Sequence, residues 1–230
     1  PLPFVCGGMM PHLAALALEH DIDAGFARHI IARHRLAAPP DAGARWPWPV
    51  RIRTLGAFDI TCDGAPAAAT RKQSRKPLEL LKLLVALAPA GGGPVPVERL
   101  CAALWPDAEG DAARNSFDNT LHRLRKLLGD EQRVQLLAGG LTLNTTTCHT
   151  DIAALGNCLT ALDASRADDD ARIGDTLALA HRGLALYRGD FLAGEDDMPD
   201  IIAARERIAA RFARHMADAG ARLEQAGRAS

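Results

Sequence analysis

The chain has 230 residues, of which 48% are hydrophobic and 24% are charged, a composition typical of a folded globular protein. This balance excludes a wholly disordered chain. The net charge is -1, so the chain as a whole lacks the strong positive charge of a dedicated nucleic-acid-binding protein. Aromatic residues make up only 4% of the sequence while Ala, Leu and Arg are abundant, which favours helices over strands.

The charge is unevenly distributed along the chain. Residues 51–150 carry 13 Lys and Arg against 10 Asp and Glu, whereas residues 151–230 carry 10 against 14. A basic part followed by an acidic part fits a unit that contacts DNA joined to a unit that contacts something else.

The five cysteines are odd in number, lie far apart and form no CxxC pair, which argues against a disulfide framework or a zinc site. Cys148, His149 and Cys158 are loose candidate ligands without a partner cluster, so we expect no metal or other cofactor. No apolar run approaches the roughly 20 residues of a membrane span, and the start lacks a Lys- or Arg-led signal peptide. We therefore expect a reduced, cytoplasmic protein without a membrane partner.

The first 48 residues predict two short helices and a linker. Apolar residues at helical spacing cover positions 11–37, with an interruption around positions 21–25. Prolines then end the helical pattern, and we expect Trp46 and Trp48 to pack on the domain that follows. Because the chain begins with Pro1, we interpret residues 1–48 as the end of a longer upstream region.

The pattern changes at Val50, where alternation predicts strands over 50–54 and 58–62 with a turn at Asp63-Gly64. Three helices follow, predicted over 78–87, 97–104 and 111–128, the last ended by Gly129. Residues 134–137 and 141–143 then predict a hairpin. The expected order is strands, three helices, hairpin.

The last part of the chain predicts Ala-rich amphipathic helices over 152–162, 173–187 and 201–223. They suggest paired antiparallel helices, as in a helical-repeat module.

The helix predicted over 111–128 has two distinct faces. At 100° per residue, Ala113, Phe117, Leu121, Leu124 and Leu128 form the core stripe. The opposite side is polar without being acidic, and it carries Asn115, Asn119, His122 and Lys126, with Arg123 at its edge. Asn and Arg side chains can form paired hydrogen bonds to bases in the major groove. A merely solvated helix face is the alternative.

Two flanking features favour DNA as the partner of this face. Arg71, Lys72, Arg75 and Lys76 stand at a helix start, where positive charge opposes the helix dipole and suggests an external anion such as backbone phosphate. A solvated cluster remains the alternative. The Gly139-Gly140 hairpin follows the candidate recognition helix directly, as the wing does in a winged helix. Only Arg133 is an obvious cation at its base, so we expect the wing to help positioning more than base reading.

The residues also resemble a known family. Residues 104–107 (Leu-Trp-Pro-Asp), 112–117 and 121–129 are similar to the DNA-binding domain of SARP-like bacterial transcriptional activators. Residues 51–58 are similar to that family's opening strand, and residues 184–192 (Leu-Ala-Leu-Tyr-Arg-Gly-Asp-Phe-Leu) resemble the signature of the bacterial transcriptional activator domain. Together these matches cover about residues 50–223.

The resemblance implies a mainly α protein with small β-sheets. An OmpR/PhoB-type winged helix (N-terminal sheet, three helices, C-terminal hairpin) would span residues 49–148, and a tetratricopeptide-like bacterial transcriptional activator domain, which looks short at its end, would span 149–230. The family's recognition helix falls on 112–128. Base-facing roles then carry over to Asn115, Asn119, His122 and Arg123, and phosphate-facing roles to Arg71, Lys72, Arg75, Arg125 and Lys126. The implied partners are double-stranded DNA, RNA polymerase and a second copy of the chain.

Two other classes of function stay open. A protein-interaction module, in which the winged helix no longer binds DNA and the acidic helices recruit a partner, fits the modest positive charge of residues 51–150. An enzyme fits less well, because His122 lies beside Arg and Lys, and Ser116 is about two turns away, which is no nucleophile–base arrangement.

Overall fold

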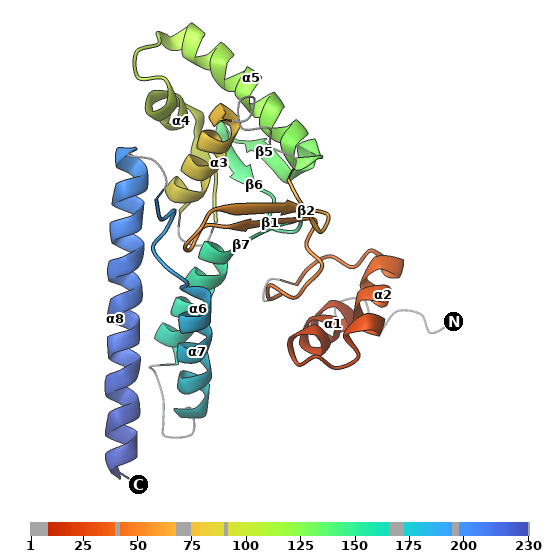
Figure 1. Cartoon of the computed structure of the whole chain (residues 1–230), viewed down its shortest axis with the longest axis vertical. Helices are drawn as coiled ribbons and strands as arrows, with labels where there is room; N and C mark the ends of the chain where they lie inside the picture. Colours follow the sequence, from red (N-terminus) through yellow and green to blue (C-terminus); the bar gives the residue numbers. More distant parts are fainter. Residues whose placement is uncertain are drawn as a thin grey trace.

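The computed structural model describes residues 9–39, 42–67, 75–89, 92–165, 173–194 and 198–229. This part of the chain is mainly helical with two small sheets, as the sequence predicts (Figure 1). The helices are α1 (Met9–Glu19), α2 (Ala24–His34), α3 (Arg75–Leu87), α4 (Val97–Leu104), α5 (Gly110–Leu128), α6 (Asp151–Ala164), α7 (Ile173–Leu186) and α8 (Pro199–Ala229). The strands are β1 (Val50–Arg53), β2 (Asp59–Cys62), β3 (Ala65–Pro66), β4 (Val95–Pro96), β5 (Val134–Leu137), β6 (Gly140–Leu143) and β7 (Cys148–Thr150).

The predicted order of strands, three helices and hairpin is confirmed between β1 and β6. Strands β1 and β2 pair antiparallel, with Val50 opposite Cys62, and the chain turns at Asp63 and Gly64, both at positive φ. The sequence did not predict β3, β4 or β7. These strands have only two or three residues each, and what defines them is pairing with distant segments.

Strands β4 and β7 tie the hairpin and the chain after it to the rest. Strand β7 runs parallel to β1 and completes the first sheet in the order β3-β2-β1-β7. Strand β4 pairs with β6, giving the second sheet the order β4-β6-β5. A side chain at Gly140 would place its Cβ 2.6 Å from the Pro94 Cβ, so this pairing requires glycine.

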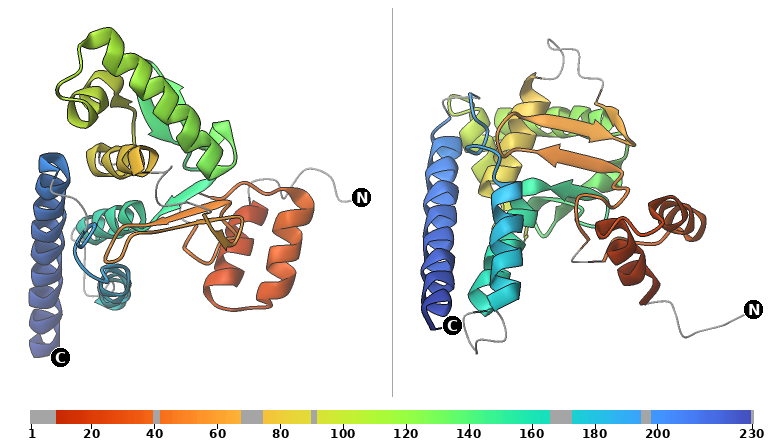
Figure 2. Two further views of the ribbon diagram at one scale, coloured as in Figure 1. Left: turned by 45° about the horizontal axis from the view of Figure 1, so that its top comes forward. Right: turned by 60° about the horizontal axis from the view of Figure 1, so that its bottom comes forward.

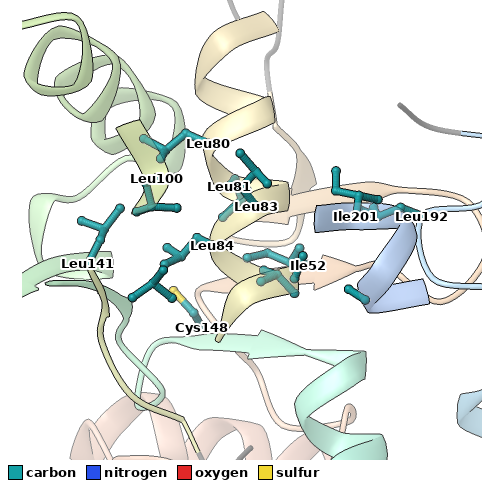
Figure 3. Packing of buried hydrophobic residues seen from close by; sticks show 14 of the residues in the cluster. Ile52, Leu80, Leu81, Leu83, Leu84, Leu100, Leu141, Cys148, Leu192 and Ile201 are labelled. Carbon is teal, nitrogen blue, oxygen red and sulfur yellow. The ribbon is translucent and has the colours of Figure 1, made fainter. Parts of the chain in front are cut away.

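Helix α3 is the centre of the main core. Its residues Leu80, Leu81, Leu83 and Leu84 are all buried, which agrees with the nearly all-apolar sequence of this helix. Figure 3 shows these leucines between two groups of side chains: Leu100 and Leu141 from α4 and β6 lie on one side, and Leu192 and Ile201 from the C-terminal part lie on the other. One continuous apolar core therefore joins the segments on both sides of β7.

The C-terminal helices pack side by side, and successive helices run in opposite directions (Figure 1). Tyr187, at the end of α7, stacks on Phe212 of α8 with ring centroids 4.2 Å apart. A Cβ on Gly183 would lie 3.2 Å from the Met216 methyl group, so the absence of a side chain there lets α7 and α8 approach closely. The predicted paired antiparallel helices are observed.

The C-terminal helices are also joined to the first sheet by hydrogen bonds. The carboxylate of Asp151, the first residue of α6, accepts from the backbone N–H groups of Thr54 and Leu55 at 2.9 Å and from the Thr54 hydroxyl at 2.7 Å. The Leu192 N–H donates to the Thr54 carbonyl at 2.7 Å, and the Gly56 N–H donates to the Asp190 carbonyl at 3.0 Å. The end of β1 is thus bound to both the start of α6 and the segment after α7.

Trp46 and Trp48 do not pack chiefly on the following domain, contrary to the sequence prediction. Both are buried in a separate small core with α1 and α2, which includes Leu18 and Ile31. Helices α1 and α2 are short and each has one apolar face to bury. The two linker tryptophans are the nearest large apolar side chains, and they cover those faces. Trp48 also reaches the first sheet, since its ring lies 5.4 Å from that of His149 in β7.

We predict that Asp151→Ala lowers the free energy of unfolding by about 2–4 kcal/mol, because it leaves the buried donors of Thr54 and Leu55 without their charged acceptor. Urea unfolding measures this loss. Asp175→Ala is the matched control, since Asp175 is an exposed acid in the first turn of α7 and its removal should change stability by less than about 0.5 kcal/mol. Equal effects of the two changes would contradict the role assigned to Asp151.

A second prediction concerns the stability of the fold at acidic pH. Burial lowers the pKa of His149 from 6.5 to about 4 and outweighs the charge of Asp151, which raises it; the charges of Arg51 and Arg182 add smaller effects in the lowering direction. The unfolded state then binds more protons between these two pH values, so stability falls as the pH drops through this range. At pH 4.5 the loss attributable to His149 is about 2 kcal/mol, from about 1.4 kcal/mol per pKa unit. Urea unfolding at pH 7 and 4.5 should give a smaller pH dependence for His149→Gln than for the wild type, and identical dependences would refute this cause.

Candidate nucleic-acid interface

Helix α5 presents the two faces that the sequence predicts. Ala113, Phe117, Leu121, Leu124 and Leu128 are all buried against the core, so the assignment of the apolar stripe is confirmed. The helix ends at Gly129, whose φ of 86° lies in the left-handed region that glycine adopts without strain. The Gly129 N–H donates to the Arg125 carbonyl. Because these five side chains must stay buried, the rotation of α5 about its axis is fixed.

The opposite face of α5 is exposed; its centre contains no carboxylate, and Asp118 at one edge pairs with Arg114 at 3.5 Å. This face brings together Asn115, Asn119, His122 and Lys126, with Arg123 at the edge, and all five are exposed. The Asn119 side-chain amide donates to the Asn115 carbonyl at 2.9 Å, which leaves the amide oxygen and one N–H of Asn119 for a ligand. The helix lies at the outer edge of the molecule (Figure 2). An extended ligand can therefore approach this face.

Arg125 occupies a different position from the other predicted site residues. It is only partly exposed, and its Nε donates to the Val134 carbonyl at 3.1 Å, at the start of the hairpin. The guanidinium therefore connects the end of α5 to β5. Its terminal nitrogens are the part of the side chain left for a phosphate contact.

The predicted basic run is described in part. Arg71 and Lys72 lie outside the described residues. Arg75 and Lys76 begin α3, and both pair with Glu79, at 2.8 and 2.9 Å. Burial raises the pKa of the Glu79 carboxyl, but hydrogen bonds and charge from Lys76 and Arg75 outweigh it and lower the pKa overall. This internal counter-ion is visible in the sequence as an acid at i+3 and i+4 from the two cations, and it was missed.

Arg75 and Lys76 differ in how far they are available. The Arg75 side chain is 81% exposed. Lys76 also donates to the Leu104 carbonyl at 3.2 Å and lies over the Trp105 ring, 5.9 Å from its centroid. Lys76 therefore joins the start of α3 to the end of α4, and Arg75 is the more accessible of the two cations.

The hairpin does not offer the cation that the sequence analysis expected. The Arg133 side chain is only 11% exposed, donates to the Leu128 carbonyl and pairs with Asp63 at 3.0 Å. The carbonyl groups at a helix C-terminus attract a nearby guanidinium, so the Arg133 side chain stabilises the end of α5 and is not available to a ligand. The turn residues Ala138 and Gly139 both have positive φ, as a two-residue hairpin turn requires, and Leu136 and Leu137 beside them are exposed.

The described residues include no group of three or more His, Cys, Asp or Glu side chains placed to hold a metal ion. Of the loose candidate ligands, Cys148 lies in β7 and Cys158 in α6, where its thiol donates to the Leu179 carbonyl. Burial raises the pKa of the Cys148 thiol to about 11. The part of the chain that the structure describes also holds no helix long and apolar enough to span a membrane.

The sequence matches no protein-family model and no curated protein. Among solved structures, the chain is similar to Mycobacterium tuberculosis EmbR in complex with a low-affinity phosphopeptide, with a TM-score of 0.54 and 24% sequence identity. The similarity covers 78% of this chain and 45% of the EmbR chain, so this chain spans less than half of EmbR. At this identity the likeness concerns the fold.

Because Arg125 holds the hairpin to α5, we predict that Arg125→Ala lowers the free energy of unfolding by about 1–2 kcal/mol. Arg123→Ala is the control. Arg123 precedes the buried Leu124 as Arg125 follows it, but its side chain is exposed, so its removal should change stability by less than about 0.5 kcal/mol. Thermal or urea unfolding of the two variants makes the comparison. A larger loss for Arg123→Ala would contradict this placement.

Proposed function

We propose that this chain is a DNA-binding transcriptional regulator, an activator of the SARP type, that reads the major groove with α5. The observation that carries the proposal is the outer face of α5, where Asn115, Asn119, His122 and Lys126 stand exposed along the centre. Arg123 lies at one edge of this face, and Asp118 at the other edge pairs with Arg114 at 3.5 Å. A helix fits the major groove, and Asn and Arg can pair with adenine and guanine there. Lys126, Arg75 and the rest of the 71–76 run would contact phosphates.

The proposed domain architecture follows from the resemblance to SARP-like activators. Residues 49–148 would form a winged helix of OmpR/PhoB type, and residues 149–230 a tetratricopeptide-like activator domain. The order of strands, helices and hairpin, the similarity in fold to EmbR and the SARP-like residues between 104 and 129 support this proposal. A cytoplasmic location, contact with RNA polymerase and a homodimer belong to the same proposal.

The direct test is a fluorescence-anisotropy titration of the whole chain against the gene's own upstream region and a random duplex of equal length, at two salt concentrations. The proposal predicts tighter binding to the upstream region and an affinity that falls with salt, with a slope of about -0.9 per phosphate neutralised. Absence of binding to either duplex at low salt would overturn it.

Two variants separate base reading from phosphate contact. Asn119→Ala should weaken specific binding by about 1–3 kcal/mol and leave the salt slope unchanged. Lys126→Ala should weaken binding to all duplexes and reduce the salt slope by about 0.9. Asn157→Ala and Arg214→Ala are the matched controls, because both residues are exposed on helices away from α5. A change at Asn157 as large as that at Asn119 would count against base reading by α5.

A protein-interaction module remains the second candidate. The hairpin favours it, because Arg133 is engaged inside the fold and the exposed side chains Leu136 and Leu137 near the turn are apolar. In this alternative the acidic helices after residue 150 recruit a partner. Capture of a partner that depends on residues 151–230, by a chain that retains no DNA, would favour it.

A further inference from the structure

Basic side chains gather on the face of the first sheet that points away from the main core. Arg51 of β1 and His149 of β7 are partners on neighbouring parallel strands, so their side chains project from the same face. The flanking residues Val50, Ile52 and Cys148 point the other way and are buried in the core. This basic face lies towards α1 and α2, whereas α5 lies on the other side of the sheet (Figure 1).

Three separate parts of the chain meet at this face. The Trp48 ring from the linker lies 5.4 Å from the His149 ring, and Arg51 donates to the Trp46 carbonyl at 2.7 Å. Arg182 of α7 pairs with Glu19 of α1 at 3.5 Å. The Arg182 guanidinium also lies against the linker, because a Cβ on Gly43 would be 3.8 Å from its Nη2.

The arginines at this junction exceed their acidic partners among the described residues, and His149, whose pKa is about 4, adds no charge at neutral pH. The buried Nε2 of His149 has no hydrogen-bond partner among these residues. Burial, and then the charge of Arg28 on α2, lowers the pKa of Arg51. Burial also lowers the pKa of His149, with smaller lowering effects from Arg51 and Arg182, against the charge of Asp151, which raises it.

Two carboxylates of the described residues, Glu19 and Asp151, offset part of this positive charge. Glu19 has an ion pair with Arg182, and the carboxylate of the nearby Asp151 is occupied by the donors of Thr54 and Leu55. Partly buried like charges destabilise one another, and an anion between them relieves the repulsion.

We propose that Arg28, Arg51, Arg182 and His149 form a binding site for the phosphate group of a small ligand. Guanidinium groups bind phosphate through two parallel hydrogen bonds, and a multiply charged oxyanion has enough acceptors for several of them at once. The ligand would connect α2 to β1 and to α7, and so would fix the N-terminal helices against the rest of the chain. The phosphate can be free or part of a nucleotide, and the experiment distinguishes the two.

The test is the thermal unfolding midpoint of the whole chain in inorganic phosphate, pyrophosphate or ATP, each compared with sodium chloride at the same ionic strength and without divalent cations. At about ten times the dissociation constant, we expect a rise of roughly 3–5 °C over the chloride reference. Equal rises with pyrophosphate and ATP would indicate a site for free phosphate groups, and a larger rise with ATP would indicate a nucleotide. No rise over chloride with any of the three would overturn the proposal.

Variants locate the site. Arg28→Gln should abolish most of the rise, because Arg28 is exposed and its replacement leaves the core intact. Arg53→Gln is the control, since Arg53 lies two residues further along the same strand face and pairs with Asp59. A rise that Arg28→Gln leaves unchanged would place the anion elsewhere and contradict the proposal.

An independent readout uses the wild-type chain. Pyrophosphate should shift the NMR resonances of the His149 ring in a saturable way, and the resonances of His122 on α5 should stay in place. Shifts confined to His122 would contradict the site. The DNA titration is separate, so a chain that binds DNA without a phosphate-specific rise keeps the proposed function and loses this site.

Discussion

The arrangement of the whole chain depends on the carboxylate of Asp151 at the first turn of α6. It accepts hydrogen bonds from two backbone N–H groups and one hydroxyl at the end of β1, and Thr54, which supplies two of these donors, is fully buried. A negative charge is also favoured there by the helix N-terminus. This single side chain joins the sheet that carries the three central helices to the helical part that follows, and one apolar core then continues across the joint.

The segment that resembles the activator-domain signature has a physical role in the same joint. Phe191 and Leu192 are fully buried, and Leu55 and Phe191 form a β-bridge. A Cβ on Gly189 would lie 3.3 Å from the Cα of Gly56, so two glycines allow the backbones to approach. Arg207 of α8 then donates to the Ala86 carbonyl near the end of α3. A displacement of the C-terminal helices would therefore move α3, on which α5 packs.

The sequence predicts the parts of the fold that local spacing determines. The apolar stripe of α5, its end at Gly129 and the hairpin turn depend on residues within a few positions of one another. The first two are observed as predicted, and the turn lies one position earlier than the predicted Gly139-Gly140, at Ala138-Gly139. Strand β7 was missed because it exists only by pairing with β1, about 100 residues earlier in the chain. Arg133 was misjudged for a similar reason, since its partner Asp63 lies in a distant turn. Pairing between distant segments leaves no periodic pattern in a single sequence.

The central claim is that α5 reads base sequence, and a selection of bound duplexes from a random pool tests it most directly. The wild-type chain and Asn119→Ala would each be carried through the same selection, and the enriched sequences compared position by position. The account predicts a defined motif for the wild type and the loss of preference at one or two adjacent positions in the variant, with the rest of the motif retained. An identical motif for both chains, or no enrichment by the wild type, would contradict the account.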